Sequence, residues 1–124
     1  MKRVLFVCVE NSNRSQMAQA FATMLGAEAH SAGSRPSGVV NPKAIAAMRE
    51  LGYDLAAHAS KSVDDYAGET FDAAVTMGCG DACPRVDAVE RVDWQIPDPR
   101  HMEPAEFRAV RDLIRQKVAE LLAA

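Results

Sequence analysis

The chain has 124 residues, of which 48% are apolar, and its formal net charge is −3 at pH 7. This length fits one domain over residues 1–124, with enough apolar side chains for a core that needs neither metal nor disulfides. The acidic balance argues against nucleic acid as the main partner, because binding a phosphate backbone requires a clustered basic surface. The first apolar run, residues 4–7, is too short for a signal segment or a membrane span, so a cytoplasmic protein with no membrane contact is expected.

Apolar stretches typical of buried strands alternate with stretches of helical periodicity along the chain. Strands are predicted at residues 3–9, 28–34, 71–77 and 91–96. Helices are predicted at residues 15–25, 42–51 and 63–66, and from Pro104 onward. This alternation predicts the α/β class with three layers, in which a four-stranded parallel sheet has helices on both faces.

The segment between the first predicted strand and the first predicted helix carries the main chemical motif. It consists of Cys8, Val9, Glu10, Asn11, Ser12, Asn13, Arg14 and Ser15. In an open α/β sheet, ligands bind beyond the carboxyl ends of the strands, where the next helix presents free N–H groups and the positive end of its dipole. A loop in that place is a cradle for an anion, and Arg14 adds a planar fork of donors that suits a tetrahedral oxyanion. Residues 8–15 are called the oxyanion loop below.

Cys8 is the candidate nucleophile of this loop. The positive field favours thiolate over thiol, and a hydrogen bond donated by the Ser15 hydroxyl stabilises the thiolate further. Asn11 and Asn13 tolerate the left-handed backbone angles that a tight loop needs. The alternative is a buried cysteine at a strand end beside a surface arginine. Cys-x5-Arg followed by Ser, at a strand-to-helix turn, favours the nucleophile.

Displacement at a tetrahedral centre by a thiolate requires a proton donor for the leaving oxygen, and Asp98 is the candidate. Pro97 and Pro99 flank it and stiffen its loop. The alternative is an ordinary surface turn, which also favours Asp and Pro. On local sequence alone that alternative is the more common one.

Cys79 and Cys83 follow the third predicted strand, whose carboxyl end is expected at the same edge of the sheet as Cys8. Three neighbouring thiols would let thiol–disulfide exchange carry oxidation away from Cys8. Zinc held by the two distal cysteines and a histidine such as His101 is disfavoured, because Cys-x3-Cys without a second pair is poor zinc spacing, and no metal site is predicted. Two inert cysteines are the remaining alternative.

Seven segments together resemble the low-molecular-weight tyrosine phosphatase superfamily, and within it the arsenate reductases of the thiol-coupled type. They are residues 7–18, 31–33, 40–45, 58–61, 75–79, 83–84 and 98–99, which span essentially the whole length. Residues 14–18, Arg-Ser-Gln-Met-Ala, are similar to the reductase branch, since the phosphatases more often have Pro directly after Arg-Ser. The phosphatases also tend to have Tyr after Asp-Pro, where this chain has Arg100 and His101.

The resemblance implies a role for each residue of the motif. Cys8 attacks arsenate, the loop and Arg14 hold the oxyanion, Ser15 activates the thiol, and Asp98 protonates a departing oxygen. Arsenate then becomes arsenite with electrons from thiols. Two alternatives remain at this point: a phosphatase that hydrolyses phosphate monoesters through a Cys8 phosphoenzyme, and a non-catalytic arsenic or metal sensor, which would leave the loop motif unexplained.

The resemblance implies no tightly bound cofactor but a reducing thiol as co-substrate. In thioredoxin-coupled members two further cysteines relay the oxidation, and Cys79 and Cys83 are the candidates here, although they lie closer together than in those members. Other relatives use mycothiol or glutathione, and then only Cys8 is needed on the enzyme. The expected partners are an arsenate- or phosphate-like oxyanion and a thioredoxin-, glutaredoxin- or mycoredoxin-type reductant of a monomeric enzyme. Some members hold potassium near the loop, but Lys61 stands where those members have an acidic residue.

Overall fold

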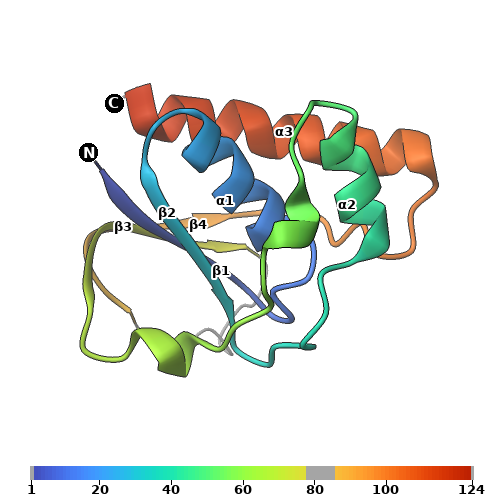
Figure 1. Cartoon of the computed structure of the whole chain (residues 1–124). Helices are drawn as coiled ribbons and strands as arrows, with labels where there is room; N and C mark the ends of the chain where they lie inside the picture. The colour runs from blue at the N-terminus through green and yellow to red at the C-terminus, as the bar shows by residue number, and fades with distance from the viewer. Residues whose placement is uncertain (1, 78–85, 124) are drawn as a thin grey trace.

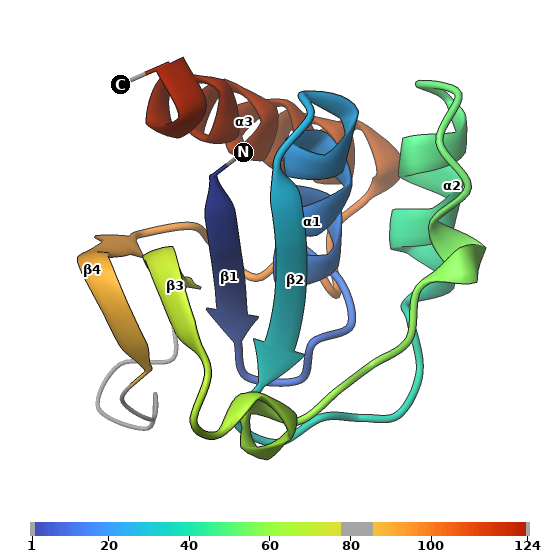
Figure 2. The same ribbon diagram turned by 60° about the vertical axis from the view of Figure 1, so that its left-hand side comes forward.

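The structure, a computed structural model, describes residues 2–77 and 86–123. Its strands are β1 (Arg3–Cys8), β2 (Glu28–Gly33), β3 (Thr70–Met77) and β4 (Asp87–Trp94). All neighbouring strands are parallel and lie in the order β2-β1-β3-β4, which Figure 2 shows. The parallel arrangement predicted from the alternation of strands and helices is confirmed.

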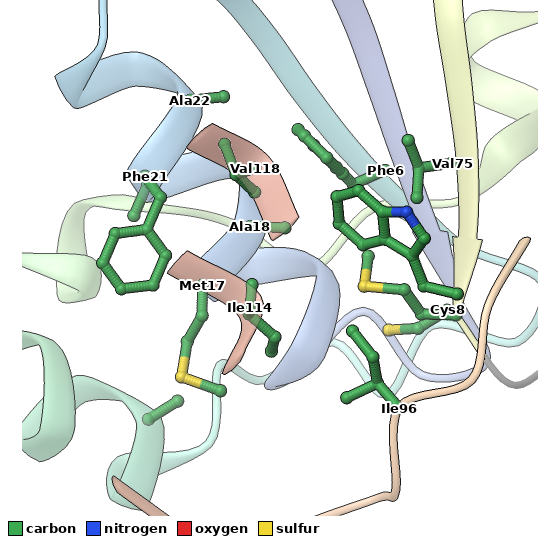
Figure 3. Close-up of a cluster of buried hydrophobic side chains, with 14 of the residues drawn as sticks. Phe6, Cys8, Met17, Ala18, Phe21, Ala22, Val75, Ile96, Ile114 and Val118 are labelled. Atoms are coloured by element: carbon green, nitrogen blue, oxygen red, sulfur yellow. The ribbon is translucent and has the colours of Figure 1, made fainter. Parts of the chain in front are cut away.

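Helices α1 (Arg14–Met24) and α3 (Pro104–Ala123) cover one face of the sheet, and α2 (Pro42–Arg49) packs beside them (Figure 1). Alternate residues of β1 point into this layer, as a strand with a side-chain period of two requires. Figure 3 shows the resulting cluster, in which Phe6 and Val75 of the sheet face Met17, Ile114 and Val118 of the helices.

The opposite face of the sheet has a smaller apolar cluster. Leu5 and Val7 of β1 lie on this side together with Phe71, and the 3-10 helix η2 (Val63–Tyr66) packs against them. Within the described ranges, η2 is the helical element of this second outer layer. The predicted three-layer α/β class therefore holds, with an unequal division of the helices between the two faces.

Two details differ from the predictions. The fourth strand begins at Asp87 and ends at Trp94, whereas residues 91–96 were predicted. It is an edge strand with mostly exposed side chains, so polar residues break the apolar run that a sequence pattern needs. A second 3-10 helix, η1 (Leu55–Ala57), was not predicted. No helix of the described chain is long and apolar enough to cross a membrane.

The strand register fixes where the oxyanion loop begins. Cys8, the last residue of β1, lies opposite Gly33 at the end of β2, and Val7 lies opposite Thr76 near the end of β3. The carboxyl ends of three strands thus meet at one edge of the sheet. Residues 8–15 leave β1 at this edge and turn into α1 (Figure 1).

Candidate active site

The oxyanion loop and the segment after β4 together enclose a cavity of about 390 Å³. Its lining consists of Cys8, Val9, Glu10, Ser12, Asn13, Arg14, Ile96, Asp98 and Arg100. The structure therefore brings Asp98, far away in the sequence, into the same cavity as the cysteine. Asn11 and Ser15, also predicted for the site, are buried beneath the lining.

Cys8 forms the floor of this cavity and is only 2% exposed. Its sulfur lies 2.8 Å from Oγ of Ser15. Asn11 donates a hydrogen bond from Nδ2 to the same hydroxyl at 2.7 Å, which leaves the hydroxyl proton free for the sulfur. Because both polar partners are buried, water does not compete for these bonds.

The backbone of the loop follows from its asparagines. Asn11 has a φ of 50°, in the left-handed region that Asn tolerates better than most residues. Asn13, for which the same conformation was considered, has a φ of −137° and instead caps α1, with its side chain accepting a hydrogen bond from the Arg14 N–H. The two asparagines thus turn the loop and start the helix, respectively.

The segment that follows β2 holds the carbonyl groups of the loop. Backbone N–H groups donate from Ser34 to Cys8, from Arg35 to Val9, from Ser37 to Glu10 and from Asn41 to Ser12, at 2.8–3.2 Å. Within the described chain, the N–H groups of residues 10–13 make no hydrogen bond. Since the carbonyls are occupied on the outer side, these N–H groups are available to an anion in the cavity.

Arg14 is 7% exposed and lies in the wall of the cavity. Nη1 donates to the carbonyl of Ile96 at 3.0 Å, and Nη2 lies 4.0 Å from Oδ2 of Asp98. Nε is buried and has no hydrogen-bond partner among the described residues. A buried donor without a partner costs about 1–3 kcal/mol, so an oxyanion that accepts from Nε would remove this penalty.

Asp98 lines the same cavity and is held by its neighbours. Oδ1 accepts hydrogen bonds from the Arg100 N–H at 3.0 Å and from Nδ2 of Asn13 at 3.4 Å. Oδ2 lies between two guanidinium groups, 4.0 Å from Arg14 and 3.8 Å from Arg100. The carboxyl group is thus fixed at the cavity wall, where a proton donor for a departing oxygen is needed.

A chain of hydrogen bonds continues from the loop toward the surface. The buried amide of Gln16 donates from Nε2 to the carbonyl and side-chain oxygens of Asn11 at 3.0 Å, and to the carbonyl of Ala59 at 2.9 Å. Its Oε1 must then accept, so Nδ1 of His58 donates to it at 2.9 Å. Nε2 of His58 in turn accepts from the Tyr53 hydroxyl at 2.6 Å. These bonds require neutral His58, and burial lowers the pKa of that side chain.

Lys61 lies next to this chain. Its backbone N–H donates to Oδ1 of Asn11 at 2.8 Å, and its ammonium donates to the carbonyl of Ala59 at 3.1 Å. Burial lowers the pKa of the ammonium group. Lys61 therefore supports the same asparagine that holds the hydroxyl of Ser15.

Cys79 and Cys83 lie outside the described residues, so their predicted neighbourhood with Cys8 stays a prediction. The zinc alternative involves the same two residues. In the described ranges, no group of three or more His, Cys, Asp or Glu side chains is arranged to hold a metal ion.

The family model for low-molecular-weight phosphotyrosine protein phosphatases matches residues 3–124. The chain belongs to this family. It is 37% identical over 128 residues to the glutaredoxin arsenate reductase of Synechocystis, covering 99% of this chain and 98% of that protein. It is 40% identical over 121 residues to an arsenate reductase of Staphylococcus aureus, covering 92% of this chain and 91% of that protein. A solved structure of an arsenate reductase in the phosphate binding state superposes with a TM-score of 0.90 at 37% identity, over 99% and 98% of the two chains.

Sequence analysis of this phosphatase-family chain missed the support beneath the loop. Gln16, His58 and Tyr53 were not assigned a role, because their contacts join segments that are distant in the sequence. One signal was available: Gln16 is a polar residue that interrupts the apolar pattern at the start of a predicted helix. A buried amide of this kind needs partners for all its polar atoms, which predicts a network but not its members.

Proposed function

We propose that the chain is an arsenate reductase, in which Cys8 attacks arsenate and thiols supply the electrons. The observation that carries the proposal is the buried Cys8 sulfur beneath an anion cavity, within a fold whose full-length relatives are named arsenate reductases. The family model that matches residues 3–124 supports one domain over residues 1–124, and we further propose that the protein acts as a monomer in the cytoplasm.

The first step forms a bond between Cys8 sulfur and arsenic. The free N–H groups of the loop and the unpartnered Nε of Arg14 hold the oxyanion. Ser15 and Asn11 stabilise the thiolate before attack. As the sulfur–arsenic bond forms, one arsenic–oxygen bond breaks, and the oxygen takes a proton from Asp98 and leaves as water. Arsenic remains in the +5 state at this stage.

The second step reduces arsenic. A thiol attacks the Cys8 sulfur, a sulfur–sulfur bond forms, and the electron pair of the sulfur–arsenic bond passes to arsenic, which leaves as arsenite. A further thiol then breaks the disulfide and restores Cys8. Two thiols become one disulfide, which balances the two electrons that arsenic gains.

Two routes can supply these thiols. In a relay, Cys79 is the attacking thiol and Cys83 then attacks Cys79. Alternatively, a small thiol such as glutathione or mycothiol attacks Cys8, followed by a glutaredoxin or mycoredoxin. The Synechocystis relative carries glutaredoxin in its name.

The test is arsenate turnover with thioredoxin, with glutathione and glutaredoxin, and with mycothiol and mycoredoxin. Cys8→Ser abolishes turnover with every reductant. Cys79→Ser and Cys83→Ser separate the routes. Both abolish turnover with thioredoxin if the relay operates, and both leave turnover with glutathione or mycothiol intact if a small thiol attacks Cys8. Rapid hydrolysis of an aryl phosphate together with no arsenate turnover under any of these conditions would contradict the proposal and favour the phosphatase alternative.

A further inference from the structure

An ion pair joins the two sides of the cavity at its rim. Nη1 of Arg100 lies 2.9 and 3.1 Å from the two carboxylate oxygens of Glu10. Glu10 belongs to the oxyanion loop and Arg100 to the segment after β4, and both residues line the cavity. The pair therefore connects the two segments that form opposite parts of the wall.

The pair lies above the reactive sulfur and not beside it. The side chains of Arg100 and Glu10 are 46% and 38% exposed, whereas Cys8 at the floor is 2% exposed. A ligand that reaches Cys8 passes this rim. An inorganic oxyanion fits entirely below it, but an ester must extend its leaving group outward, because the sulfur attacks from the floor.

Arg100 is held in this position from its backbone as well. Its N–H donates to Asp98 at 3.0 Å, and its carbonyl accepts from the Lys43 ammonium at 3.1 Å. The guanidinium also lies 3.8 Å from Asp98. The backbone of Arg100 is thus held on both sides, and its guanidinium has two carboxylate neighbours, Glu10 and Asp98.

The described part of the lining offers little apolar surface to an aromatic group, since Val9 and Ile96 are its two aliphatic residues. Among the described residues of the cavity wall, none has an aromatic side chain, and the rim is formed by two opposite charges. An aryl group at the rim would have to displace the ion pair, which leaves Glu10 without its partner and Arg100 with Asp98 alone.

We propose that the pair of Glu10 and Arg100 is a specificity-determining gate, which admits small inorganic tetrahedral oxyanions and disfavours aryl phosphate esters. This inference rests on the proposed function, since it explains how a phosphatase-family cavity selects an inorganic anion. The gate acts on ligand size at the rim, separately from the groups that hold the oxyanion below.

The experiment compares the binding of benzylphosphonate and methylphosphonate, two tetrahedral anions that differ by a phenyl group, by calorimetry. In Arg100→Ala and in Glu10→Ala, the affinity for benzylphosphonate relative to methylphosphonate rises by at least about tenfold over the wild type. The two substitutions change the local charge in opposite directions. A purely electrostatic effect would change the affinities for both phosphonates by the same factor in each variant and leave their ratio unchanged.

Arg108→Ala is the matched control, because Arg108 makes a similarly exposed pair with Glu50 away from the cavity. In this control, the affinity for benzylphosphonate relative to methylphosphonate stays at the wild-type value. An unchanged ratio in both rim variants, or a change in Arg100→Ala alone, would overturn the gate. Binding is measured without a reductant, so the result is independent of whether arsenate is reduced, and failure of the reductase proposal shows instead in arsenate turnover.

Discussion

At the scale of single residues, the proposed chemistry depends on one hydroxyl placed between an amide and a sulfur. Ser15 receives a hydrogen bond from Asn11 and lies 2.8 Å from Cys8. A hydrogen bond to a charged group contributes about 1.5–3 kcal/mol, more than one between neutral groups. In the proposed mechanism, this hydroxyl stabilises the thiolate that attacks the oxyanion.

Ser15→Ala removes this bond and leaves the Asn11 amide without its acceptor. We expect kcat/KM for arsenate to fall by about tenfold to a hundredfold, because the thiolate loses a charge-assisted hydrogen bond. Steady-state kinetics with a saturating reductant measures the effect. Thr23→Ala, which removes an exposed hydroxyl on the same helix, leaves kcat/KM unchanged. A Ser15→Ala enzyme with wild-type kcat/KM would show that the hydroxyl does not activate Cys8.

The motif made the residues of the oxyanion loop that line the cavity predictable, whereas the residues behind the loop were not predictable. Cys8 and Arg14 share one short segment, so their spacing and their position after a strand indicate a joint site. The local sequence alone gave only weak support for Asp98, and its position in the cavity beside Cys8 is known only from the structure. The contact between Gln16 and His58 depends on how two distant segments pack, and no local pattern encodes such a contact.

At the scale of elements, the end of β2 shapes the oxyanion loop. A Cβ atom on Gly33 would lie 2.6 Å from the carbonyl oxygen of Val9 and 3.0 Å from the backbone nitrogen of Asn11. Only a glycine lets the two backbones approach this closely. The Ser-Ala-Gly segment at residues 31–33, noted in the sequence for its family resemblance, thus has a steric reason.

Gly33→Ala forces the loop away from the strand. We expect phosphate affinity, measured by calorimetry, to fall by at least about tenfold, because the N–H groups of the loop lose their alignment. Gly26→Ala is the contrasting variant: its φ is 89° with open space around the added atom, so it lowers the free energy of unfolding by about 1 kcal/mol and leaves phosphate binding intact. Equal phosphate affinity in Gly33→Ala and the wild type would contradict the steric account.

Elements with a strong apolar period were predictable, and elements without one were not. β1 is buried along nearly its whole length, so its run of apolar residues identified it almost to the residue. β4 has exposed side chains on both sides and was placed at residues 91–96, too late in the chain, because its pairing with β3 and not its burial makes it a strand. The parallel topology was accessible from the order of the elements, since strands that alternate with helices pair in parallel.

At the scale of the whole molecule, the network beneath the loop links the protonation of His58 to folding. His58 joins the segment after η1 to Gln16 of α1, and its neutral form fits both of its hydrogen bonds. Burial lowers its pKa in the folded state below the value of about 6.5 in the unfolded chain. Between these two pKa values the unfolded chain binds more protons than the folded one, so the free energy of unfolding falls as the pH falls.

We therefore expect the stability contributed by neutral His58 to be fully present above about pH 6.5 and to be lost as the pH falls toward its folded pKa. Urea unfolding between about pH 7.5 and pH 5.5 measures the effect, and His58→Asn has a shallower pH dependence than the wild type over this range. The carboxyl groups of Glu28 and Glu50 do not interfere. Their pKa values are lowered by hydrogen bonds chiefly from Arg3 and Arg108, respectively, so they titrate below this window. Parallel pH curves for the variant and the wild type would show that His58 is not the group that couples folding to pH.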